Sequence, residues 1–146
     1  MLTKLESEVI SRYWEDIADA IVASVPPLAE VTDTALNELL KGLLEDRMQA
    51  WILCDIIEDR TVVYALVITT IWRDPGLDTK NLLIYALYGY STIQESMWKA
   101  GLETLRKYAR GIGCKAIVGL TSVPRIREVV EQLGGDTSIS LITLAV

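Results

Sequence analysis

Apolar and polar positions follow a helical spacing through the first third of the chain. Between residues 6 and 24 the apolar side chains recur at steps of three and four, with carboxylates between them, which predicts an amphipathic helix. Val25-Pro26-Pro27 should end this helix, because proline restricts the residue before it and has no backbone N–H. A second helix is predicted from a cap at Asp33 to about Met48, with leucines along one side.

The pattern changes near residue 50 to the β-branched and aromatic composition of strands. Runs at 50–57 and 61–72 flank the polar turn 58–60 and predict a β-hairpin. A third strand is predicted from Leu82 to Tyr90. All three runs are almost continuously apolar, so we expect both faces of the sheet to be covered.

The second half of the chain predicts a helix and then a strand. Two overlapping capping boxes within residues 91–95 open the helix, and Gly111 or Gly113 ends it. The strand follows over residues 115–120.

A further helix and strand complete the predicted fold. Ser122 caps the helix, Gly134-Gly135 ends it, and a last strand runs from about Thr137 to the C-terminus. The order α-α-β-β-β-α-β-α-β indicates a mixed α/β fold, in which an antiparallel meander precedes a β-α-β crossover. A chain of 146 residues fits one domain, 1–146.

Composition and charge exclude several classes of protein. Hydrophobic residues make up 51% of the chain and charged residues 23%, which excludes an intrinsically disordered protein. The net charge of −6 argues against binding to nucleic acid or to an anionic membrane, since both need clustered lysine and arginine. The longest apolar stretch, 62–72, is too short to cross a bilayer, and the N-terminus lacks the pattern of a signal peptide. We therefore expect a cytoplasmic protein with no nucleic-acid or membrane partner.

Histidine is absent from the sequence. Its absence removes the commonest general base, the serine and cysteine nucleophiles that depend on imidazole, and the commonest zinc ligand. Cys54 and Cys114 have no CxxC spacing, which excludes a thioredoxin-type site and a zinc knuckle. We expect no metal site. The cysteines are interpreted as buried free thiols, with a single disulfide as the alternative.

Two segments resemble a known family. Residues 108–117, YARGIGCKAI, look like the junction between the cofactor helix and the next strand in the GNAT superfamily of N-acetyltransferases. Residues 131–135, EQLGG, are similar to the segment before that family's closing strands. The resemblance implies a GNAT-like fold over nearly the whole chain, with acetyl-CoA as cofactor and acetylation of an amine as the chemistry.

The positions that would bind the cofactor depart from the family pattern. Counted back from Tyr108, the family's arginine or glutamine falls on Ile93, and its glycine positions fall on Ser96 and Trp98. An indole there would fill the space that a phosphate needs beside the backbone, and Glu95 would repel the phosphate. We therefore predict no cofactor and only a vestigial cleft, formed by Leu87, Tyr88, Gly89, Ile93, Ser96 and Trp98.

The catalytic positions of the family are also changed. The tyrosine that often protonates the leaving thiolate corresponds to Val130, which cannot donate a proton. The other candidate acids and bases are more typical of packing or of surface carboxylates, so no catalytic residue is assigned. These candidates are Tyr88, Tyr90, Tyr108, Asp55 and Asp78.

The chain has more aromatic surface than so small a domain can place at its centre, which indicates a contact with a partner. The predicted contact residues lie at strand ends: Trp72, Arg73, Tyr88 and Tyr90. Residues 138–146, SISLITLAV, would leave an apolar sheet edge that favours strand pairing with another chain.

These observations favour a non-catalytic GNAT-fold interaction or assembly module that binds a protein partner or forms a homo-oligomer. The resemblance extends to small acetyltransferase-like proteins of tailed bacteriophages, which implies a phage virion as the setting. The alternative is a divergent acetyl-CoA-dependent N-acetyltransferase that holds the pantetheine arm by strand pairing at residues 87–89. A third interpretation is a small-molecule sensor that uses the same cleft.

Overall fold

The computed structural model describes residues 1–25 and 30–146, and it contains one five-stranded sheet with the strand order β1-β2-β3-β4-β5. The first four strands are antiparallel neighbours, and β5 pairs with β4 in parallel. The strands are β1 (Leu2–Lys4), β2 (Met48–Ile57), β3 (Arg60–Arg73), β4 (Lys80–Gly89) and β5 (Ile117–Gly119). The mixed α/β architecture predicted from the sequence is confirmed.

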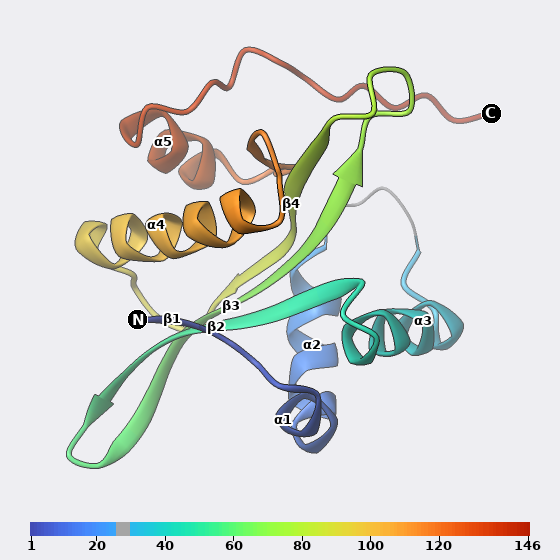
Figure 1. Ribbon diagram of the computed structural model, residues 1–146. Helices are drawn as coiled ribbons and strands as arrows, with labels where there is room; N and C mark the ends of the chain where they lie inside the picture. Colours follow the sequence, from blue (N-terminus) through green and yellow to red (C-terminus); the bar gives the residue numbers. More distant parts are fainter. Residues whose placement is uncertain (26–29) are drawn as a thin grey trace.

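Helices cover both faces of this sheet, as the continuous apolar strands predicted. Figure 1 shows α1, α2 and α3 on one side and α4 and α5 on the other. One apolar core packs around Ile21 and Ile68 beneath α1–α3, and a second packs around Leu82 and Leu105 beneath α4. The helices are α1 (Ser7–Arg12), α2 (Trp14–Ser24), α3 (Asp33–Leu44), α4 (Glu95–Gly111) and α5 (Pro124–Gln132).

The N-terminal region differs from the prediction in three places. Residues 2–4 form a strand, in which Leu2 pairs with Leu53, and the predicted helix over 6–24 is divided at Tyr13. The division lets α1 and α2 approach the same core at different angles. The cap of α3 is Thr32 rather than Asp33, because the Thr32 hydroxyl accepts the Ala35 N–H at 3.2 Å. The predicted stop at Pro26-Pro27 lies outside the described residues.

Two further predicted caps are wrong. α4 begins at Glu95 after Gln94, which makes no side-chain capping bond, so the capping boxes in 91–95 do not form. α5 begins after Val123 instead of Ser122, and the hydroxyl of Thr121 accepts the Val123 N–H at 3.1 Å. The end of α4 agrees with the prediction, since Gly113 adopts a left-handed φ of 80° just beyond the last helical turn.

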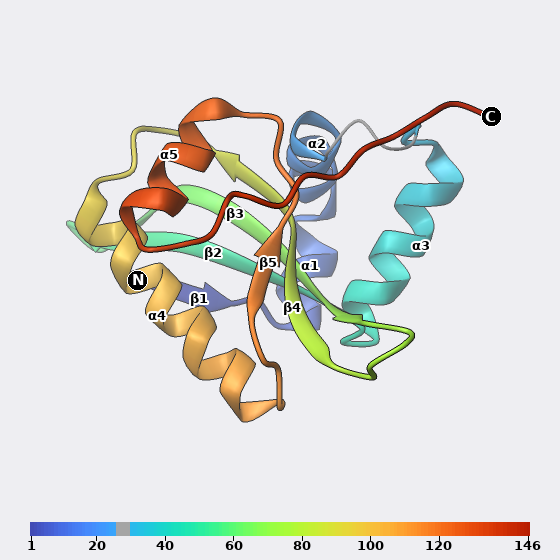
Figure 2. The ribbon, with the colours of Figure 1, turned by 90° about the horizontal axis from the view of Figure 1, so that it is seen from above.

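The predicted last strand is absent from the structure. Residues 137–146 are extended but unpaired, and they run away from α5 to a projecting C-terminus (Figures 1 and 2). Arg127 donates to the Thr137 carbonyl oxygen and Thr137 donates to Glu131, so the start of the segment is held on α5. Apolar composition predicted a strand, but a strand also needs a neighbouring edge to pair with.

The cysteines are both free: Cys54 is buried, and Cys114 is partly buried. In the parts of the chain that the structure describes, no helix is long and apolar enough to cross a membrane. The same residues contain no cluster of three or more acidic or cysteine side chains that could hold a metal ion.

Candidate functional site

A β-bulge opens the sheet between β4 and β5. Ala86 pairs with Ile68 and Ile84 pairs with Thr69, which leaves Tyr85 as an extra residue on β4. β5 pairs with β4 only from Leu82 to Ile84. Bulges bend a strand and commonly end its pairing. Beyond the bulge, no described strand covers the β5 side of β4.

The open edge presents unpaired backbone groups. Tyr90 donates its backbone N–H to the Tyr64 carbonyl oxygen at 2.8 Å, which makes this a hydrogen-bonded pair with β3. Hydrogen-bonded and non-hydrogen-bonded pairs alternate in an antiparallel ladder, so Tyr88 also turns its N–H towards β3. The backbone groups of Leu87 and Gly89 therefore face the gap.

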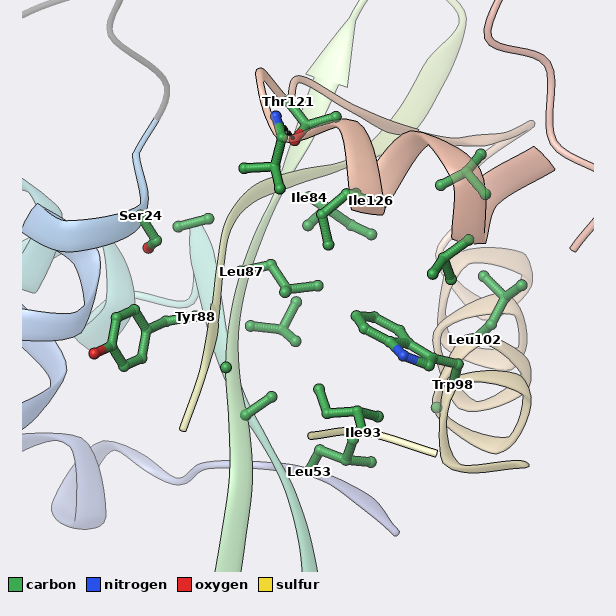
Figure 3. A pocket seen from close by; sticks show the side chains of 18 of the residues that line it. Ser24, Leu53, Ile84, Leu87, Tyr88, Ile93, Trp98, Leu102, Thr121 and Ile126 are labelled. Atoms are coloured by element: carbon green, nitrogen blue, oxygen red, sulfur yellow. Dashed lines mark hydrogen bonds between the residues drawn. The ribbon is translucent and has the colours of Figure 1, made fainter. Parts of the chain in front are cut away.

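A pocket of about 470 Å³ lies at this gap. Its walls come from the end of α2, from β4, from the sheet-facing sides of α4 and α5, and from residues 120–123. Ser24 and Tyr88 line it on the α2 side of the sheet, whereas Leu102 and Ile126 line it on the α4–α5 side (Figure 3). The pocket therefore reaches both faces of the sheet through the opening that the bulge creates.

The described lining of this pocket carries no aspartate, glutamate, lysine or arginine. Its polar groups are the indole N–H of Trp98 and five hydroxyls, those of Ser24, Tyr85, Tyr88, Thr121 and Ser122. Such a pocket suits a ligand whose buried part is largely apolar, because an unpaired charge is costly to bury.

Five of the six predicted cleft residues line the pocket: Leu87, Tyr88, Gly89, Ile93 and Trp98. Ser96 does not, because it lies exposed in the first turn of α4. The indole of Trp98 points from α4 towards Leu87 and is half-buried (Figure 3). It forms one wall, and the cavity remains open beside it.

The start of α4 repels an anion less strongly than the sequence suggested. Glu95 is exposed, and its carboxylate pairs with Lys99 one turn later at 2.5 Å. That hydrogen bond lowers the pKa of Glu95 and places a positive charge beside the negative one. Met97 and Trp98 both donate to the Gln94 carbonyl oxygen, whereas the N–H groups of the two residues before them have no partner inside the helix.

The candidate bases lie away from the pocket. Asp55 pairs with the N-terminal ammonium at 3.6 Å, and Asp78 pairs with Arg73 at 3.5 Å. Both carboxylates are exposed, and neither lines the pocket. They are surface carboxylates, as the sequence indicated.

Among the tyrosines, Tyr88 alone of the three candidates lines the described pocket. Tyr90 packs edge-on against Tyr88, with ring centroids 5.0 Å apart. Burial raises the pKa of Tyr90. Tyr108 packs in the same manner on Trp51, outside the pocket. Val130 lines the pocket and supplies no proton.

The predicted partner contacts do not form one patch with the pocket. Trp72 is 51% exposed at the end of β3, beside Arg73, and neither lines the pocket. Tyr88 is half-buried and lines the pocket, whereas Tyr90, which packs on Tyr88, is 50% exposed and does not line it.

Sequence reasoning missed the small and hydroxyl residues of the pocket. Ala65, Gly101 and Thr121 line it, but each type is common in ordinary strands, helices and loops. They come from β3, from α4 and from the loop after β5, and only the tertiary fold brings them to one place, so no local signal in the sequence identifies them.

No protein-family model matches the chain, and no curated protein matches it in sequence. Solved structures match it over its full length. A probable acetyltransferase aligns with a TM-score of 0.68 at 12% identity, covering 100% of this chain and 97% of the other. Ribosomal-protein-alanine N-acetyltransferase from Brucella melitensis biovar Abortus 2308 aligns with a TM-score of 0.65 at 13% identity, covering 100% and 99%.

Aminoglycoside N-acetyltransferase AAC(6')-Iy is also similar in structure. Its complex with a CoA-linked bisubstrate analogue aligns with a TM-score of 0.69 at 15% identity, covering 99% of this chain and 96% of the other. Its complex with CoA aligns with a TM-score of 0.69 at 16% identity, covering 99% and 93%. These cofactor complexes contradict our prediction that the chain takes no cofactor. The strand order, the gap beyond the β4 bulge and these alignments together show that the chain has the fold of the GNAT N-acetyltransferases.

Proposed function

We propose that this chain is a divergent N-acetyltransferase that binds acetyl-CoA in the pocket beside β4. The observation that carries the proposal is the unpaired edge at Leu87 and Gly89, which lines a pocket reaching both faces of the sheet. A donor on the α4–α5 side and an amine on the α2 side can meet through such an opening. This proposal replaces the interpretation of the cleft as vestigial.

The residues present fit the pantetheine part of the cofactor. Its amide groups are short, extended hydrogen-bonding units, and a free strand edge with an N–H and a carbonyl at alternate residues matches them. The fit to the diphosphate is weaker, because α4 starts without a glycine-rich loop. The groups that would face the diphosphate are the free N–H groups of Glu95 and Ser96 and the ammonium of Lys99.

The residues of the chain would act by placement and by exclusion of water. A bound thioester would supply an activated acetyl group, and its transfer would form a C–N bond to the amine, break the C–S bond and move an amine proton to the sulfur. Leu87 and Gly89 hold the donor at the gap, and the apolar lining keeps water from the carbonyl. Because no carboxylate or imidazole lines the described pocket, the amine would react as its free base.

Amide hydrogen exchange tests this proposal directly. In the free protein the Leu87 and Gly89 amides should exchange quickly, whereas the Tyr88 amide, which faces β3, should be protected and serves as the internal control. Saturating acetyl-CoA should slow exchange at Leu87 and Gly89 and leave Tyr88 unchanged. Unchanged exchange at all three amides would refute the proposed binding mode.

The interaction-module interpretation is the second candidate, and exposed apolar residues favour it. Ile142 and Leu144 are 87% and 92% exposed on the C-terminal segment, and Trp72 is 51% exposed on β3. Sedimentation over a range of concentrations tests it, because a homo-oligomer would raise the mass and Ile142→Lys would reverse the rise. The cytoplasmic or phage virion setting stays a prediction.

A further inference from the structure

The pocket has its own wall on the α2 side of the sheet, where the proposed function places the amine. Ser24 and Val25, at the end of α2, form this wall together with Tyr85 and Tyr88 of β4. Val25 and both tyrosines pack against the α1–α3 core, which assigns them to this face. Figure 3 shows Ser24 and Tyr88 on the same side of β4. An amine bound here would contact two aromatic rings and the last turn of α2.

This wall offers an ammonium group no counter-ion. The carboxylates of α2, those of Glu15, Asp16 and Asp19, are exposed and lie outside the lining. The loop at 120–123 and the facing sides of α4 and α5 bring no charged side chain to the described lining. Residues 26–29 are Pro, Pro, Leu and Ala, so they carry no charged side chain either. An ammonium buried in this pocket would therefore stay unpaired, which is costly.

The hydroxyls of the wall cannot remove the proton of an ammonium group at neutral pH. Burial, and after it Tyr88 and Asp16, raise the pKa of Tyr90, so this neighbouring hydroxyl stays protonated. An alkylamine such as a lysine side chain has a pKa of about 10.4 and is almost entirely charged at about pH 7. An arylamine is uncharged there, because its nitrogen lone pair is delocalised into the ring.

The Ser24 hydroxyl is arranged to accept a hydrogen bond from such an amine. It donates its own proton to the Ala20 carbonyl oxygen at 2.7 Å, so its oxygen lone pairs are what it can present to a ligand. The rings of Tyr85 and Tyr88 offer an aromatic ligand the offset or edge-on packing that such rings prefer. The wall thus matches both parts of an arylamine, the neutral –NH₂ and the ring.

We infer that the acceptor at this wall is an arylamine rather than an alkylamine such as a lysine side chain. The inference rests on the proposed function and names the class of its acceptor. The nitrogen lone pair would form the C–N bond, the C–S bond would break with its electron pair on sulfur, and one N–H proton would pass to that sulfur. The products are an aryl amide and a free thiol. An arylamine nitrogen that bonds to a carbonyl carbon is more acidic than a thiol, whose pKa is about 8.5, so this transfer needs no protein acid.

Calorimetric titration of two isomeric amines into the protein saturated with CoA tests the inference without turnover. The isomers are 4-ethylaniline, with its nitrogen on the ring, and 2-phenylethylamine, with its nitrogen at the end of the alkyl chain. At about pH 7 the aniline should bind at least about tenfold more tightly, because it alone is uncharged. Between about pH 7 and pH 9 its affinity should stay constant, whereas that of phenylethylamine should rise about tenfold per pH unit. Initial rates with acetyl-CoA should follow the same order.

A charge placed on the wall should reverse the preference. Ser24→Asp puts a carboxylate beside the amine, so phenylethylamine should bind at least as tightly as ethylaniline at about pH 7. Ser24→Asn is the matched control, because it has nearly the same size and no charge, and it should keep the original order.

The outcomes separate the inference from the proposed function. If CoA binds and ethylaniline binds no better than its isomer, the inference is overturned and the proposed function stands. If neither CoA nor acetyl-CoA binds, both are overturned. A preference for ethylaniline that is the same in Ser24→Asp would place the amine away from this wall and overturn the inference. Should Ser24→Asp fail to fold, the pH dependence of the two isomers in the original protein decides.

Discussion

The indole N–H of Trp51 donates a hydrogen bond to the hydroxyl oxygen of Thr69 at 2.9 Å, inside the sheet. Thr69 in turn donates to Gln49 Oε1 at 2.9 Å, and Gln49 donates to the Asp46 carbonyl oxygen at 3.1 Å. Trp51 and Thr69 are 4% and 0% exposed. The chain of hydrogen bonds satisfies buried polar groups on two neighbouring strands, so its loss should be costly.

We predict that Thr69→Val lowers the free energy of unfolding by about 1–3 kcal/mol, because it leaves the Trp51 N–H and the Gln49 oxygen without partners. Thr70→Val is the control, since the Thr70 hydroxyl donates to the Arg47 carbonyl oxygen at an exposed site and should cost less than about 1 kcal/mol. Urea unfolding monitored by tryptophan fluorescence gives both values. Equal losses of unfolding free energy in the two variants would show that the buried series of hydrogen bonds contributes no more than the exposed one.

The Glu95–Lys99 pair predicts opposite effects of two charge changes on the binding of CoA. Glu95→Gln removes a negative charge from the start of α4 and should raise affinity up to about fivefold at low ionic strength. Lys99→Gln removes the compensating charge and should lower affinity by a similar factor. Both effects should shrink at high ionic strength in calorimetric titrations. Changes of the same sign, or changes independent of salt, would place the diphosphate away from α4.

Two glycines predict opposite effects of substitution by alanine on stability. A Cβ on Gly135 would collide with Val130 Cγ1 and lie 3.0 Å from the Val130 carbonyl oxygen, so Gly135→Ala should destabilise the fold by more than about 1 kcal/mol. Gly111, at the end of α4, has no atom within 4 Å of the new Cβ. Gly111→Ala should raise the free energy of unfolding by about 0.4–1 kcal/mol. Thermal unfolding of the two variants checks the contrast, and a stable Gly135→Ala would show that this loop can shift freely.

Stability should fall as the pH rises above about 10. The hydrogen bond from Lys4 to Asp46 at 2.8 Å raises the pKa of Lys4, and burial raises the pKa of Tyr90 and of Tyr108. A group with a raised pKa holds its proton longer in the folded chain than in the unfolded one, so its contribution is complete below the unfolded pKa and lost above it. Urea midpoints measured from pH 8 to about pH 11 should therefore decrease.

Lys4→Met is the matched variant for this pH dependence. It removes one of the three raised groups, so its midpoint should fall less steeply with pH than that of the original protein. A midpoint that stays constant or increases over the alkaline range would contradict the argument.

The long elements were predictable from the sequence because their patterns are long. The strands at 48–57 and 60–73 and the helix at 95–111 were found to within a few residues, since each carries many positions of one period. β1 has only three residues, and its pairing with Leu53 connects distant parts of the chain, so no local pattern identifies it. The C-terminal strand was predicted from composition alone, and residues 137–146 pair with no strand of the described structure.

The site was predicted less completely, for a physical reason. Ile93 and Trp98, which the alignment to the Tyr108 segment assigned to the cleft, both line the pocket, and their role there stays a prediction. The expected exclusion of a cofactor failed because a side chain can form a wall without filling a space, and because Lys99 was not considered with Glu95. Ala65 reaches the pocket through the strand register and Gly101 through the packing of α4 on the sheet, and neither is encoded locally in the sequence.

The bulge at Tyr85 makes the opening of the sheet depend on a single inserted residue. Tyr85 and Ala86 both pack towards the α1–α3 core, while Ile84 and Leu87 pack towards α4, so the alternation of faces resumes unchanged on either side. Deleting that tyrosine would keep every other side chain of β4 on its present face and would remove the register shift beyond which β4 no longer pairs with β5. The opening in the sheet therefore depends on one residue, and its loss would remove a single side chain, that of Tyr85, from the α1–α3 core.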